Sequence, residues 1–117
     1  MRIERAIEGK PKGWWTGAWD SSLPIALGYA TTGINEPHLH RRITEIYLVA
    51  IGTSTLRIEE KSVQLGAGDV AIVEPGEAHT FLASSIPYFH FVIHSPSLSP
   101  EEITEERQGV PPSRLGL

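Results

Sequence analysis

Hydrophobic and polar residues alternate with a period of two along several short stretches of this chain. These stretches are rich in β-branched and aromatic residues, and they cover residues 44–51, 55–59, 69–73, 79–83 and 88–94. A period of two is that of a strand with one face turned toward a core. The chain also has 11 glycines and 9 prolines, which separate most of the stretches. Short strands with turn residues between them predict an all-β domain, either a sandwich or a barrel.

A helix signal is found only near the C-terminus. Ser99 is a preferred N-cap residue, Pro100 suits the first helical position, and Glu102 stands three residues after the cap. This pattern predicts a short helix over residues 99–107. The tail that begins at Gly109 is expected to be extended, and either disordered or docked on a neighbour.

Length and composition are those of one globular domain. A chain of 117 residues, 40% hydrophobic and 21% charged, is large enough for a single core. We expect one β-barrel domain over residues 1–98, followed by the short helix and tail over residues 99–117. The formal net charge of -4 gives no electrostatic reason to expect nucleic acid or an anionic membrane as a partner.

Three absences narrow the chemistry and the location further. The chain has no cysteine, which excludes disulfides and thiolate metal sites and fits a reducing compartment. No signal-peptide pattern stands at the start, and no apolar run approaches the roughly 20 residues of a membrane-spanning helix. The cytoplasm is therefore the expected location.

Three histidines and one glutamate are candidate metal ligands. His38 and His40 are two residues apart, so both imidazoles point to the same side of a strand. Glu45 is out of phase with them on one uninterrupted strand, so we expect a bend or bulge around residues 41–44. His79 follows a turn signal that returns the chain to the sheet. Three imidazoles and a carboxylate suit one divalent transition metal ion, such as Mn, Fe, Ni or Zn, with coordination positions open for water or substrate.

The spacing of these residues resembles that of a known family. Residues 33–52 read G-INEP-H-L-H-RRIT-E-IYLVAI-G, and residues 68–79 read GDVAIVEPGEAH. The two segments resemble the two motifs of the cupin superfamily. Glu74 stands at a position where the family usually has proline, and Ala83 stands where an asparagine is common, but neither departure removes a metal ligand.

The resemblance implies a double-stranded β-helix, or jelly-roll, cupin barrel with a short C-terminal helix. It also implies that His38, His40, Glu45 and His79 hold the metal ion. A homodimer is expected as well, because both faces of the strand over residues 44–51 are apolar beyond Glu45, so a second layer or a partner subunit should cover the outer face.

The strand over residues 88–94 adds a conditional candidate. His90 and His94 share one face of it, and three apolar residues line the other: Phe89, Phe91 and Ile93. If the histidine face points inward, His90 supports a metal ligand or acts as a catalytic general acid or base. If the phenylalanines point inward, His90 is an exterior residue. His94 is expected at the end of the strand.

Three tryptophans, Trp14, Trp15 and Trp19, fall within six residues. They are expected to pack around the first strands, and the alternatives are a platform for a small molecule or a subunit contact.

The reaction does not follow from the ligand set. Cupins with such a site include dioxygenases, decarboxylases, isomerases and lyases, and also binding modules without turnover. We expect a metal-dependent enzyme acting on a small oxygenated molecule. The alternative is a non-catalytic cupin that binds a small molecule or a sugar.

Overall fold

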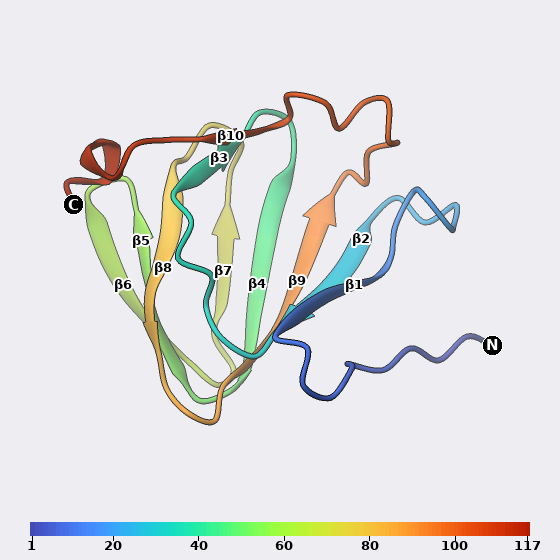
Figure 1. Ribbon diagram of the computed structural model, residues 1–117, viewed down its shortest axis with the longest axis horizontal. Helices are drawn as coiled ribbons and strands as arrows, with labels where there is room; N and C mark the ends of the chain where they lie inside the picture. Colours follow the sequence, from blue (N-terminus) through green and yellow to red (C-terminus); the bar gives the residue numbers. More distant parts are fainter.

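The computed structural model describes residues 1–117 and consists of two antiparallel five-stranded sheets. Figure 1 shows the sheets facing each other as the two walls of a barrel. The first sheet has the order β1-β2-β9-β4-β7, and the second has the order β10-β3-β8-β5-β6. The strands are β1 (Lys12–Thr16), β2 (Ala26–Ala30), β3 (His38–His40), β4 (Thr44–Ile51), β5 (Thr53–Ile58), β6 (Lys61–Gly66), β7 (Val70–Val73), β8 (His79–Ser84), β9 (Phe89–Ser95) and β10 (Arg107–Gly109). The predicted all-β architecture is confirmed.

The core lies between the sheets and follows the alternation in the sequence. Along β4, Tyr47 and Val49 are buried, whereas Ile46 and Leu48 on the other face are only half-buried. The core cluster combines inward residues of both sheets, as expected for two sheets packed face to face. It contains Tyr47, Val49, Leu56, Leu65, Val73, Phe81, Tyr88 and Val92.

The bend expected between His40 and Glu45 is a crossing between the two sheets. β3 belongs to the second sheet and β4 to the first, so residues 41–43 carry the chain across the end of the barrel. Ile43 is buried in this crossing and anchors it. The out-of-phase spacing of Glu45 is thereby resolved, because its strand starts anew on the opposite wall.

The helix expected over residues 99–107 does not form. The capping contacts are present, since Glu102 N–H donates to Ser99 Oγ at 3.3 Å and Ser99 N–H donates to Glu102 Oε1 at 3.2 Å. The chain nevertheless continues as turns and then enters β10, which pairs with β3. Tertiary strand pairing here overrides a local helix signal of modest strength.

The short helix lies further on, as a 3-10 helix over Pro112–Leu115, which we label η1. Leu115 is fully buried, and its carbonyl accepts a hydrogen bond from Arg57 Nε at 2.8 Å. The tail is thus docked on its own barrel. No helix in the structure combines the length and the hydropathy that crossing a bilayer would require.

Candidate metal centre

The four residues singled out by the sequence meet inside the barrel. β3 contributes His38 and His40, β8 contributes His79, and β4 contributes Glu45 from the opposite sheet. All four are buried. The Nε2 atoms of His38, His40 and His79 lie 3.8, 3.4 and 2.9 Å from the nearest carboxylate oxygen of Glu45.

Hydrogen bonds on the far side of each ring hold these three imidazoles in position. His38 Nδ1 is 2.6 Å from the carbonyl oxygen of Glu36, and His79 Nδ1 is 3.1 Å from that of Glu77. His40 Nδ1 is 2.7 Å from Glu106 Oε2. Because a carbonyl or a carboxylate only accepts, Nδ1 is the protonated nitrogen in each ring. In a neutral ring, Nε2 then presents a lone pair to Glu45.

This donor arrangement fits a cation. His40 Nε2 is buried and has no hydrogen-bond partner. A buried lone pair aimed at a buried carboxylate is unfavourable unless a positive charge lies between them. Imidazole nitrogens with a carboxylate are a donor set for Mn, Fe, Ni or Zn, and ring nitrogens oriented from behind are usual for metal-binding histidines.

A fifth residue, His94 on β9, joins the cluster. β9 pairs with β4 so that His94 lies directly opposite Glu45, and its Nε2 contacts Glu45 Oε2. Two triplets have donor atoms within 4.8 Å of one another, and both include Glu45: His38, Glu45 and His79, and His40, Glu45 and His94. Sequence reasoning placed His94 only at a strand end, because its position opposite Glu45 depends on the pairing of β9 with β4.

The electrostatics of the cluster centre on Glu45. Burial alone would raise its pKa, but the four imidazoles that face the carboxylate hold the pKa of Glu45 well below its ordinary value. Tyr47 donates a hydrogen bond to the same carboxylate. Burial and the negative charge of Glu45 raise the pKa of Tyr47 well above its ordinary value, so the phenol stays protonated. The site therefore keeps a carboxylate anion in the barrel interior.

Glu106 is a second buried carboxylate that sequence reasoning missed. Its Oε2 accepts from His40, while its Oε1 accepts from the N–H groups of Arg42 and Ile43 at 3.2 and 3.0 Å. Burial opposes ionisation, but these hydrogen bonds lower the pKa of Glu106. Burial opposes protonation of the His40 ring, but Glu45 and then Glu106 raise the pKa of His40 above its ordinary value. No motif marks Glu106 in the sequence, where it lies within the helix expected over residues 99–107.

His90 lies inside the barrel but outside the cluster. Of the two orientations left open by the sequence, the structure has the histidine face of β9 inward, and Phe91 is 42% exposed on the outer face. His90 Nδ1 is hydrogen-bonded to Tyr88 Oη at 2.7 Å. Burial lowers the pKa of His90 to about 4, so the ring is neutral at pH 7.

The cluster opens into a cavity of about 860 Å³, a volume typical of small-molecule sites. Its wall includes His38, His40, Glu45 and His94 of the cluster, and also His90. Trp14 and Trp19 line it as well, whereas Trp15 packs on the outer face against Tyr29 and Phe91, with ring centroids 5.0 and 5.8 Å apart. The tryptophan cluster is therefore divided between the cavity and the outer face.

Comparison with solved structures shows the same fold in several small proteins. A nucleoside dehydratase, PAC13 from Streptomyces, superposes with a TM-score of 0.65 at 13% identity, over 94% of this chain and 92% of that one. A cupin 2 conserved barrel domain protein from Salinispora arenicola gives 0.66 at 13% identity, over 90% and 94%. KdgF from Halomonas sp. gives 0.63 at 18% identity, over 79% and 87%.

Sequence comparison agrees with the fold. No curated protein matches the chain. The model of the AraC-like ligand-binding domain matches residues 21–115, which includes all the strands of the metal centre. The chain therefore belongs to the AraC-like ligand-binding domain family, and its structure is that of a small cupin barrel.

Proposed function

We propose that this protein is a metal-dependent cupin enzyme that acts on a small oxygenated molecule. The observation that carries the proposal is the orphaned, buried Nε2 of His40, which faces the anionic Glu45 among three further imidazoles. We assign His38, His40, Glu45 and His79 as ligands of one divalent ion, Mn, Fe, Ni or Zn, and add His94 to them.

Each part of the site has a task under this proposal. A bound ion would supply Lewis acidity, or redox chemistry if it is Mn or Fe, to oxygen atoms of the substrate. Tyr47 keeps the Glu45 carboxylate oriented through its hydrogen bond. His90 is neutral, and because Nδ1 is engaged by Tyr88, Nε2 is the nitrogen that can exchange a proton with a molecule in the cavity. We therefore propose His90 as the catalytic acid or base.

The fold alone does not select a reaction, but two observations support catalysis over an inert scaffold. The candidate ligands gather around Glu45, and the wall of the cavity also holds His90, whose pKa burial lowers to about 4. Groups with such perturbed pKa values gather at functional sites. One neighbour of the same fold is a nucleoside dehydratase, which is consistent with chemistry on this scaffold.

The second candidate is a binding module that holds a small molecule or a sugar without turnover. The family match to an AraC-like ligand-binding domain favours it. The half-exposed Trp14 and Trp19 at the cavity also suit a sugar face.

Metal content tests the proposal. Protein purified from metal-supplemented medium is expected to contain close to one Mn, Fe, Ni or Zn ion per chain by elemental analysis. His40→Ala and Glu45→Ala should lower this content sharply while the circular dichroism spectrum stays that of a folded barrel, because the core cluster includes none of the ligands. A metal-free native protein would overturn the proposal.

A matched pair of variants tests the role of His94. His94→Ala should weaken metal binding at least tenfold, whereas His90→Ala should retain the ion, because both imidazoles point inward from β9 but only His94 reaches Glu45. Equal metal content in the two variants would remove His94 from the ligand set.

Turnover separates the two candidate functions. Oxygen uptake or product formation with small carboxylates and phenols supports the enzyme, and saturable binding without product supports the binding module.

A further inference from the structure

The inner face of the first sheet arranges the cavity side chains in three successive rows. The register of β1, β2, β9 and β4 defines them. The first row holds Ala26, His94 and Glu45, the second holds Trp14, Gly28, Val92 and Tyr47, and the third holds Lys12, Ala30, His90 and Val49. Adjacent rows are two residues apart, which is about 6.8 Å along a strand. Trp14 therefore lies one row from the metal centre, and Lys12 lies two rows from it.

The middle row presents the indole of Trp14 to the cavity. The Trp14 indole lies against β2 at Gly28, where an added Cβ would come within 2.8 Å of Trp14 Cε3 and 2.7 Å of the Gly13 carbonyl oxygen. Glycine at this position thus allows the ring to lie against the strand. The indole is 4.5 Å from the His94 ring and 6.4 Å from Trp19, measured between centroids. Trp14 and Trp19 are 46% and 49% exposed, so a ligand in the cavity would cover apolar surface that water now contacts.

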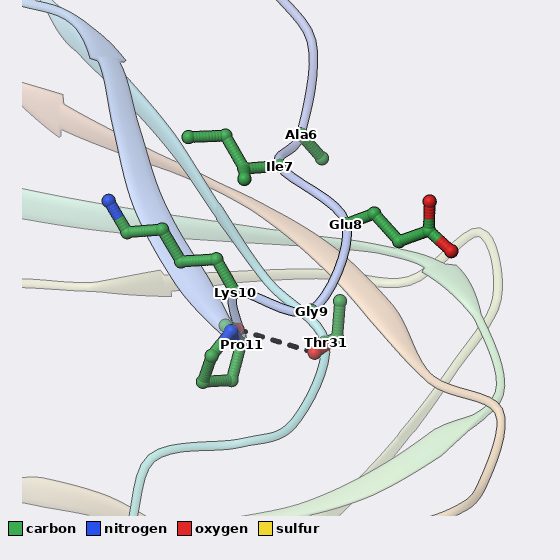
Figure 2. Close-up of a pocket in the computed structure, with 7 residues that line it drawn as sticks. All are labelled: Ala6, Ile7, Glu8, Gly9, Lys10, Pro11 and Thr31. Carbon is green, nitrogen blue, oxygen red and sulfur yellow. Dashed lines mark hydrogen bonds between the residues drawn. The ribbon is translucent and has the colours of Figure 1, made fainter.

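Positive charge lies at the far end of the cavity, on Lys12 of the far row and on Lys10 just before β1. Lys10 and Lys12 line the cavity, and the ion pairs of the structure involve arginines and histidines but no lysine. Figure 2 shows the side chains of Lys10 and Glu8 pointing away from each other. The carboxylates that line the cavity are all engaged: Glu36 with Arg107, Glu45 with the imidazoles and Glu106 with His40. This end of the cavity is therefore positively charged, although the chain as a whole carries a net charge of -4.

We propose that the substrate is a small aromatic acid with its oxygen donors and its carboxylate at opposite ends. The oxygen donors meet the metal centre, the ring lies against Trp14, and the carboxylate reaches Lys12 and Lys10. This inference rests on the proposed metal-dependent function of the same cavity. The order of the three rows supports the inference about the substrate, because each row offers a different chemistry: metal ligation, aromatic contact and positive charge. A neutral sugar would gain nothing from the positive charge at this end of the cavity.

Calorimetric titration of zinc-loaded protein at pH 7 tests the inference, with metal content measured on the same sample. The probes are 3,4-dihydroxybenzoate, its methyl ester and L-arabinose. The acid should bind about fivefold more tightly than the ester, which keeps the ring and the hydroxyls but lacks the charge. Lys12→Gln should abolish this difference by weakening the acid alone. Lys61→Gln, which removes an exposed lysine from β6, should leave it unchanged. Trp14→Leu should weaken acid and ester alike.

Two results would overturn the inference while the metal centre stands. The first is equal affinity for acid and ester, or no binding of either, in a fully zinc-loaded sample. The second is tighter binding of L-arabinose than of the acid. A sample that fails to take up zinc overturns the proposed function instead, so the two failures are distinguishable. Circular dichroism of each variant checks that a lost affinity does not come from unfolding.

Discussion

His90 and His94 lie on the same face of β9, four residues apart, yet their surroundings give them opposite properties. His94 contacts the carboxylate of Glu45. His90 lies among aromatic rings, with the centroids of Tyr47 and Phe81 at 5.1 and 5.2 Å, and burial lowers its pKa to about 4. The sequence pattern treats the two residues alike, so only the neighbours supplied by adjacent strands distinguish His94, a candidate ligand beside Glu45, from His90, an imidazole buried among aromatic rings.

The buried, neutral state of His90 predicts a stability that falls with acidity. Between pH 6.5 and about 4 the unfolded chain binds a proton at this residue that the folded chain does not, so the free energy of unfolding decreases as the pH falls through that window. The loss from this residue is about 3 kcal/mol. Urea unfolding of metal-free protein at a series of pH values should therefore show a shallower pH dependence for His90→Asn than for the native chain. Parallel curves would contradict the prediction.

At the scale of elements, β10 connects the C-terminal segment to the candidate metal centre. It pairs with β3, so Arg107 and Gly109 lie opposite His40 and His38. Glu106, the residue before β10, holds the back of the His40 ring. The C-terminal segment thus orients two of the candidate ligands, one through the backbone and one through a side chain.

Glu106→Gln is expected to weaken metal binding about 10- to 100-fold while the barrel stays folded. The two oxygens of Glu106 accept hydrogen bonds from the His40 ring and from the N–H groups of Arg42 and Ile43. Glutamine has only one acceptor oxygen, so either the His40 ring or the two backbone N–H groups lose their acceptor. Competition with a zinc chelator measures the affinity. Glu105→Gln, a change at the exposed neighbouring residue, is the control. An unchanged affinity in Glu106→Gln would show that His40 needs no support from the C-terminal segment.

The sequence predicted those parts of the site that residue alternation or the spacing of the two motifs marks. The strands follow from alternation, and the His38, His40, Glu45 and His79 cluster follows from motif spacing. His94 could not be assigned, because its position opposite Glu45 depends on the register between two strands that lie more than forty residues apart in the chain. The C-terminal helix was misplaced for a related reason: the Ser99 capping contacts are local and do form, but pairing of β10 with β3 determines the conformation that follows.

At the scale of the whole molecule, the outer face of the first sheet is unusually apolar. Cross-strand neighbours on this face are Ile46 and Ile72, and Leu48 with Val70 and Phe91. Ile72 is 57% exposed and Phe91 is 42% exposed. Contiguous exposed apolar surface is typical of interaction sites. It is the face expected from the sequence to meet a partner subunit, and we expect it to form the interface of a homodimer.

Ile72→Glu is expected to convert the dimer into a monomer, because a two-fold interface would bring the introduced carboxylates into one apolar contact. Light scattering coupled to gel filtration measures the mass. Leu82→Glu on β8 is the matched control, since Leu82 is an exposed residue of the opposite sheet and should leave the dimer intact. A native chain that runs as a monomer, or a dimer lost only in the Leu82 variant, would contradict this interface.

The candidate ligands come from both walls of the barrel: His38, His40 and His79 from the second sheet, and Glu45 and His94 from the first. An ion held by all of them would act as a cross-link between the sheets, in the place that a disulfide takes in secreted β-sandwiches. Because the unfolded chain cannot offer this set of donors at one point, the melting temperature should climb with the logarithm of free metal concentration. Thermal separation of the sheets and release of the ion would then be one event.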